Sequence, residues 1–145
     1  MEQLLVQIIQ HIAESMPGLS LVDEDYGQLE AQEDTYPVTF PCVLVGNTDT
    51  DWEERNGASQ RGNSSFTVRL AINCYDDTYA TSGTVEKIAE RQQLAHDMFK
   101  ILHHYKPLPR MSQLVRVKSR GYSINGGIKI YELIYTFRQS EEEQQ

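Results

Sequence analysis

Residues 114–138 read LVRVKSRGYSINGGIKIYELIYTFR, and this stretch decides the fold class. Apolar and polar residues alternate in 114–122 and again in 128–138, which is typical of two half-buried β-strands. Between them, Asn125-Gly126 followed by a second glycine is a strong signal for a tight turn. We therefore predict an antiparallel β-hairpin in the C-terminal part of the chain.

The segments before this hairpin predict two helices and three strands. Apolar residues recur at helical spacing in 2–16 and in 84–105, so each segment is expected to form a helix with one apolar face. Short β-branched or alternating runs predict strands at 19–22, within 37–46 and at 66–75. The order α-β-β-β-α-β-β fits an α+β two-layer sandwich, in which one antiparallel sheet packs against two helices.

The length of 145 residues is that of one domain. We expect a single domain over residues 1–138, followed by a disordered acidic tail at 139–145. No apolar run is long enough to span a membrane, and the N-terminus lacks the charge pattern of a signal peptide. Cys42 and Cys74 lie in apolar contexts, so we expect buried free thiols in a reducing compartment.

Charge is divided unevenly along the chain. The net charge is −8, but residues 1–60 carry −11 and residues 61–145 carry +3. This balance argues against general affinity for nucleic acid, which favours a basic protein. Two interpretations stay open: the two signs pair inside the fold, or the acidic surface of one copy meets the basic surface of the next.

Residues 47–64 form a long polar segment with a single aromatic residue, Trp52. Polar stretches of this length are uncommon in compact domains and are often functional. One interpretation is a mobile arm on which Trp52 anchors a partner. The other is a long hairpin whose tryptophan folds back onto the sheet.

A ladder of cations is the most distinctive surface feature that the sequence predicts. Arg116, Lys118 and Arg120 alternate along a predicted strand and should share one face, with Arg110 nearby. The ladder fits an exposed sheet face or protected edge, a protein interface, or a nucleic-acid surface. Nucleic acid is the least favoured of the three, because only Tyr122 continues the register as an aromatic residue for base stacking.

Familiar catalytic and metal-binding patterns are missing from the sequence. His96 lies two helical turns from His103 and His104, which is about 10–12 Å and too far for one metal ion to bind both ends. The acidic run at 49–53 lacks the glycine and the glutamate that a calcium loop requires. No phosphate-binding, dinucleotide-binding or serine-nucleophile motif occurs, so we predict no cofactor, no metal and no enzyme activity. A small enzyme with a dispersed active site stays open.

The chain resembles the tail terminator and tail completion proteins of long-tailed bacteriophages and related small neck proteins of prophages. The resemblance covers nearly all of residues 2–138. It lies in an opening helix like LLVQIIQHIAESMPGL, a strand like YPVTFPCVLV and a polar loop before a strand like FTVRLAINCYDD. A helix like VEKIAERQQLAHDMFKILHH and the hairpin of residues 114–138 complete it.

This resemblance implies a non-enzymatic structural protein. Such proteins form a ring, typically a hexamer, that caps the tail tube, stops its growth and presents a surface to the head. The implied partners are other copies of the chain, the tail tube and head-connector proteins. The segment around Trp52 would contact the tube or connector. The implied location is the cytoplasm of a bacterial host and then the virion tail. The alternative function is a small nucleic-acid-binding module that uses the basic C-terminal hairpin.

Overall fold

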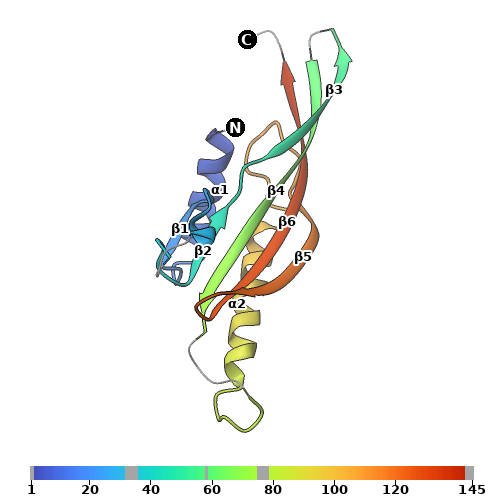
Figure 1. The fold of residues 1–145 in the computed structure, drawn as a ribbon. Coiled ribbons are helices and arrows are strands. Elements are labelled where there is room, and N and C mark those ends of the chain that lie inside the picture. Colours follow the sequence, from blue (N-terminus) through green and yellow to red (C-terminus); the bar gives the residue numbers. More distant parts are fainter. Residues whose placement is uncertain (1, 32–35, 58, 75–78, 143–145) are drawn as a thin grey trace.

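The computed structural model describes residues 2–31, 36–57, 59–74 and 79–142. Within these residues, two α-helices and one six-stranded sheet make up the fold (Figure 1). The helices are α1 (Glu2–Ser15) and α2 (Glu86–Leu102), and a short 3-10 helix, η1, spans Gln28–Glu30. The strands are β1 (Leu21–Glu24), β2 (Cys42–Val45), β3 (Asp49–Asn56), β4 (Ser59–Asn73), β5 (Val115–Ile124) and β6 (Ile128–Glu142).

The sheet is built around β4 and β6, which pair antiparallel over the full length of β4. The order across the sheet is β1-β2-β4-β6-β5, and β3 pairs with the N-terminal half of β4. All pairs are antiparallel except β1 with β2, which are parallel because the long connection between them crosses one face of the sheet. The predicted α+β class and element order are confirmed, with β3 as an additional strand before β4, and the sheet is mixed rather than wholly antiparallel.

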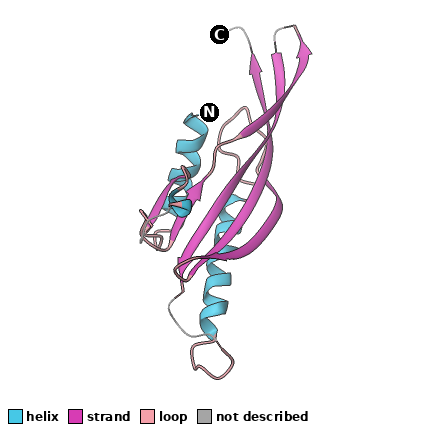
Figure 2. Cartoon of the chain, viewed as in Figure 1, coloured by secondary structure: helices cyan, strands magenta, loops and turns pink. Residues whose placement is uncertain are grey.

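Both helices pack on one face of the sheet, which holds the main hydrophobic core (Figure 2). Leu4, Ile8 and Ile12 of α1 are buried there, as are Met98 and Leu102 of α2. The alternating pattern of the sequence correctly predicts which strand residues face them. These strand residues are Phe66, Val68, Leu70, Leu133, Tyr135 and Phe137.

The opposite face is covered over β2 and the neighbouring ends of β4 and β6 by the connection between β1 and β2. Leu29 of η1, together with Tyr36 and Phe40, packs with Cys42 and Ile130 in a second, smaller apolar cluster. Cys42 is fully buried, and burial raises the pKa of its thiol to about 11, so the thiol stays protonated at neutral pH. The expectation of a buried free thiol is confirmed for this residue.

Strands β3, β4 and β6 continue beyond the helices as a projecting ribbon (Figures 1 and 2). We define the ribbon as β3 with residues 59–65 of β4 and 136–142 of β6, which pair antiparallel with one irregularity between Glu54 and Asn56. Of the two interpretations of residues 47–64, the structure favours the long hairpin.

The C-terminal end of the ribbon corrects the predicted acidic tail. Residues 139–142 belong to β6, opposite Ser59–Gly62 of β4, so the tail does not begin at 139. The rest of the predicted tail, 143–145, lies outside the described residues. The physical reason is that β4 supplies backbone hydrogen-bond partners, which hold a polar and acidic segment in a strand without any apolar pattern.

Candidate protein interface

The ribbon is held together by polar contacts and by one aromatic contact. The hydroxyl groups of Thr50 and Ser64 lie 2.8 Å apart across β3 and β4. The Gln139 amide of β6 donates to the same Ser64 oxygen at 3.0 Å. These hydrogen bonds join all three strands, so the ribbon has a defined register although it lacks an apolar core of its own.

Trp52 lies on the ribbon, beside Gly62 of β4. A Cβ atom at Gly62 would lie 2.9 Å from ring carbon Cζ3 of Trp52 and 2.6 Å from Cγ2 of Thr50, so glycine makes room for both side chains. Trp52 remains 40% exposed. The sequence-predicted aromatic anchor is therefore folded onto its own hairpin and still presents apolar surface to solvent.

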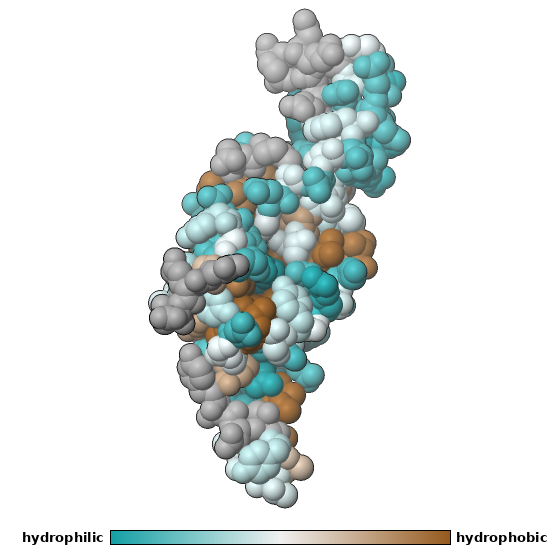
Figure 3. Space-filling view, viewed as in Figure 1, coloured by the Kyte–Doolittle hydropathy of each residue, from teal (hydrophilic) through white to brown (hydrophobic). Residues whose placement is uncertain are grey.

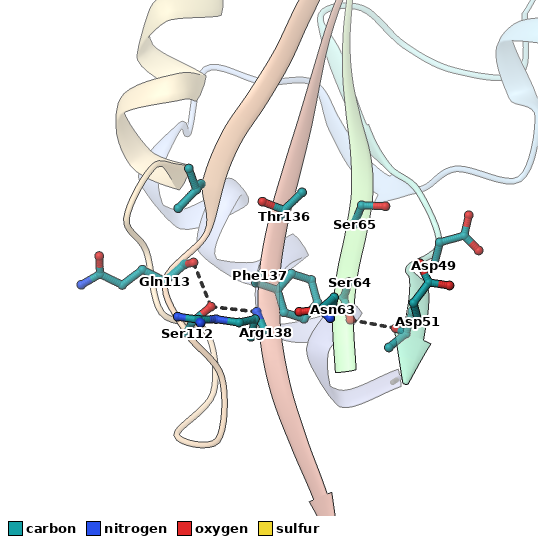
Figure 4. Close-up of a pocket in the computed structure, with 12 residues that line it drawn as sticks. Asp49, Asp51, Asn63, Ser64, Ser65, Ser112, Gln113, Thr136, Phe137 and Arg138 are labelled. Carbon is teal, nitrogen blue, oxygen red and sulfur yellow. Dashed lines mark hydrogen bonds between the residues drawn. The ribbon is translucent and has the colours of Figure 1, made fainter. Parts of the chain in front are cut away.

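A groove of about 1040 Å³ lies where the ribbon leaves the body, on the face opposite the helices (Figure 4). Its lining is polar and includes Asp49, Asp51, Asn63 and Arg138. The Ser112 hydroxyl group in its wall accepts a hydrogen bond from the Arg138 backbone N–H at 2.8 Å. The twelve lining residues contain no histidine or cysteine, so this groove offers no nucleophile beside an imidazole base.

The predicted cation ladder is divided by a β-bulge. Arg116 lies opposite Tyr135, whereas Lys118 lies opposite Ile134, with an irregularity between them. Tyr135 and Ile134 are successive residues of β6 and point to opposite faces, so Arg116 and Lys118 do too. The prediction that Arg116, Lys118 and Arg120 share a face is therefore wrong, because one additional residue in β5 reverses the alternation.

Arg116 points to the helix face of the sheet. Its guanidinium carbon lies 3.8 Å from the centre of the Phe99 ring of α2, within the range of a cation–π contact. The Arg116 backbone N–H donates to Nδ1 of His103 at 3.2 Å. Partial desolvation, followed by the positive neighbours His104 and Arg116, lowers the pKa of His103 below its ordinary value.

Lys118 and Arg120 point to the opposite face, where Arg120 is already paired. Its Nε atom donates to Glu132 of β6 at 2.6 Å. Lys118 is exposed and takes part in none of the ion pairs seen among the described residues. Arg110 lies outside the ladder, beside the ribbon, where its carbonyl oxygen accepts the Ser140 backbone N–H at 3.3 Å.

A charge network centred on the buried Arg69 lies on this face and was missed by the sequence analysis. Arg69 of β4 makes two hydrogen bonds to Asp25, at 2.8 and 3.1 Å, and two to Glu30, at 2.8 and 3.0 Å. The Tyr122 hydroxyl group accepts from Arg69 at 3.4 Å and donates to Glu132 at 3.3 Å. Part of the uneven charge is thus neutralised within one chain, since Asp25 and Glu30 come from the acidic half and Arg69 from the basic half.

A second groove, which we call the basic groove, runs between α2 and the strands β5 and β6. It measures about 680 Å³. Its twelve lining residues include the cations Arg91, Arg116 and Lys129 and no carboxylate. Arg120 also borders the groove, but its side chain is paired with Glu132 on the opposite face of the sheet. Its apolar floor includes Tyr131 and Leu133. The buried Nε atom of Arg91 has no hydrogen-bond partner among the described residues.

In the described ranges, no group of three or more His, Cys, Asp or Glu residues is placed to hold a metal ion. His103 and His104 stack with ring centres 4.0 Å apart, and His96 lies against Phe99. None of the described helices is both long enough and apolar enough to cross a membrane.

The fold, rather than the sequence, relates this chain to known proteins. No protein-family model matches the sequence, and no curated protein matches it. The structure is similar to a solved chain from a structure titled "Virion of native gene transfer agent (GTA) particle", with a TM-score of 0.59 and 10% sequence identity. The match covers 94% of each chain. At this identity the likeness shows a shared fold over almost the whole chain.

Proposed function

We propose that this protein is a non-enzymatic structural component of a phage or prophage tail. In this proposal, copies of the chain form a ring, such as a hexamer, that terminates the tail tube and joins it toward the head. The observation that carries the proposal is the fold shared with a chain of a virion particle over 94% of both chains. The resemblance of the sequence to bacteriophage tail proteins also supports the proposal. That resemblance rests on the order of the elements and on the residue patterns of the individual segments.

Two of the edge strands of the sheet, β3 and β5, also support assembly. Strand β3 carries four carboxylates and one arginine, whereas β5 carries three cations and no carboxylate. Three of the exposed large apolar side chains, Trp52, Val115 and Val117, lie on these same strands. Unlike surfaces on one molecule can join head to tail, and such contacts close into a ring when the rotation between copies is suitable.

The interface residues of this proposal are Trp52, Arg110, Arg116, Lys118 and Arg120. The split ladder leaves the alternative nucleic-acid module with less support, since its cations no longer form one continuous stripe. Particle assembly would take place in the cytoplasm of a bacterial host, and the protein would then remain in the virion tail.

The first test is the mass of the purified protein in solution, measured by light scattering at low and high salt. We expect a discrete oligomer, and rings in electron micrographs of the same sample. Reversing charge with Lys118→Glu and Arg120→Glu should weaken self-association, and an unchanged oligomer would remove these two residues from the interface. A chain that stays monomeric under all conditions would contradict self-assembly.

The role in the tail needs a separate test. Deletion of the gene in a producing strain should yield tail tubes of variable length that do not join heads. Tubes of normal length that remain unjoined would place the protein at the neck instead. Normal joined particles would contradict the proposed role altogether.

A further inference from the structure

We infer that the ribbon of one copy docks on the basic groove of an adjacent copy. The inference rests on the proposed self-assembly and names the two surfaces that meet. It is carried by the charge of the ribbon, the charge of the groove and the direction in which each lies along the sheet.

The ribbon presents carboxylates that its own chain leaves available. Every residue of β3 except Thr50 is exposed. Glu53 is paired with Arg61 at 3.0 Å. Asp49, Asp51 and Glu54 take part in none of the ion pairs found in the described parts of the chain. Figure 3 shows the ribbon as a mainly hydrophilic projection, so charge and hydrogen bonds would dominate its contacts.

The basic groove provides the complementary surface. Three of its cations, Arg91, Arg116 and Lys129, have no carboxylate beside them in the lining, and the Arg91 Nε atom is left without a partner among the described residues. Its apolar floor could receive the exposed part of Trp52. A charged rim around an apolar floor is the arrangement that protein interfaces commonly show.

The ribbon cannot reach the groove of its own chain. Asp49 of β3 and Val115 of β5 lie at the same level of the sheet, connected through Ser65 and Thr136. From this level β3 runs toward the ribbon end and β5 runs in the opposite direction, with β4 and β6 between them. Docking therefore requires a second copy, and it joins two unlike surfaces, which lets successive copies follow one another head to tail in a ring.

The test uses charge reversal on the full chain in two separate variants. The ribbon variant carries Asp51→Lys and Glu54→Lys, and the groove variant carries Arg116→Glu and Lys129→Glu. Each variant places like charges opposite one another, so each should associate at least about tenfold more weakly than the wild type. Glu14→Lys on α1 and Lys106→Glu in the loop after α2 are matched controls, and both should assemble normally.

Mixing the two variants is the decisive step. The reversed ribbon of one variant then meets the reversed groove of the other, and the two unreversed surfaces also match. An equimolar mixture should therefore recover the wild-type oligomer, with the two variants present in equal numbers by native mass spectrometry. A single chain that carries all four substitutions should recover it as well. The emission of Trp52 should shift to shorter wavelength whenever the oligomer forms, because docking buries the indole.

The outcomes separate this inference from the proposed function. Wild-type assembly that neither variant weakens would overturn ribbon docking and leave the ring proposal standing. Weakened variants that mixing does not restore would also overturn it, since the two surfaces would then act at different contacts. A wild type that stays monomeric but binds mixed-sequence DNA at about 50 mM salt would overturn both and assign the groove to nucleic acid.

Discussion

The two halves of β4 share the same neighbour, β6, but differ in what covers them. Residues 66–73 place Phe66, Val68 and Leu70 under the helices, and these side chains are at most 3% exposed. Residues 59–65 read SQRGNSS and contain no large apolar side chain. Residues 66–73 are held in place by burial, whereas residues 59–65 are held by backbone pairing and polar contacts. One strand thus combines a stable core with a surface that is available to a partner.

The largest expected difference between the halves comes from truncating their side chains. Leu70→Ala should destabilise the protein by about 3 kcal/mol, because it leaves a cavity between the sheet and the helices. Asn63→Ala, on the exposed face of the ribbon half, should change the free energy of unfolding by less than about 0.5 kcal/mol. Urea denaturation followed by circular dichroism measures both values. Equal effects would show that the ribbon is as important for stability as the core.

An intermediate effect is expected inside the ribbon. Gly62→Ala adds a Cβ atom 2.6 Å from Thr50 and 2.9 Å from Trp52, so these side chains must move. We expect a loss of about 1 kcal/mol and a change in tryptophan emission, which reports on the ribbon because Trp52 is the sole tryptophan.

Gly57→Ala is the matched control for this ribbon variant. A Cβ atom at Gly57 would meet nothing within 4 Å, so neither stability nor emission should change noticeably. Unchanged emission in Gly62→Ala would show that Trp52 does not rest on β4 in solution.

The smallest effect is the pH dependence of the free energy of unfolding that Glu30 contributes through Arg69, which lies in residues 66–73 of β4. A hydrogen bond from Arg69, opposed in part by desolvation, lowers the pKa of Glu30 below its ordinary value of 4.5. The ionised form therefore stabilises the folded state above that value, and this contribution is lost as the pH falls through the lowered pKa. Because the Glu30 side chain is 59% exposed, solvent screening keeps the contribution below about 1 kcal/mol.

The pH effect is measured against Glu30→Gln. The wild type should be the more stable protein at neutral pH, and the difference should shrink below about pH 4.5, as the lowered pKa requires. Asp25 and Glu132 lie in the same network and are unchanged in both proteins. Glu14→Gln, on the exposed face of α1, serves as the control. A difference that is constant with pH would assign the effect to packing rather than to charge.

Core elements were predictable because their side chains carry a period. The alternation in residues 66–74 and 128–138 correctly places Val68, Leu70 and Tyr135 on the helix face. The glycines of the predicted turn adopt the positive φ angles that it requires, 90° at Gly126 and 73° at Gly127. The ribbon has no such period, so the sequence predicts only a polar segment at 47–64 and a tail at 139–145 where the structure has paired strands.

Sequence by itself determined the α+β class, the order of the elements other than β3, and the buried faces of β4 and β6 in the core, because burial imposes a period on side chains. Only the tertiary structure decided that β1 joins the sheet in parallel and that β3 and the end of β6 form the ribbon. It also decided that a bulge at Val117 separates Arg116 from Lys118 and that Arg69 binds Asp25 and Glu30. These features depend on backbone hydrogen bonds and on contacts between distant segments, and such contacts leave no local pattern in the chain.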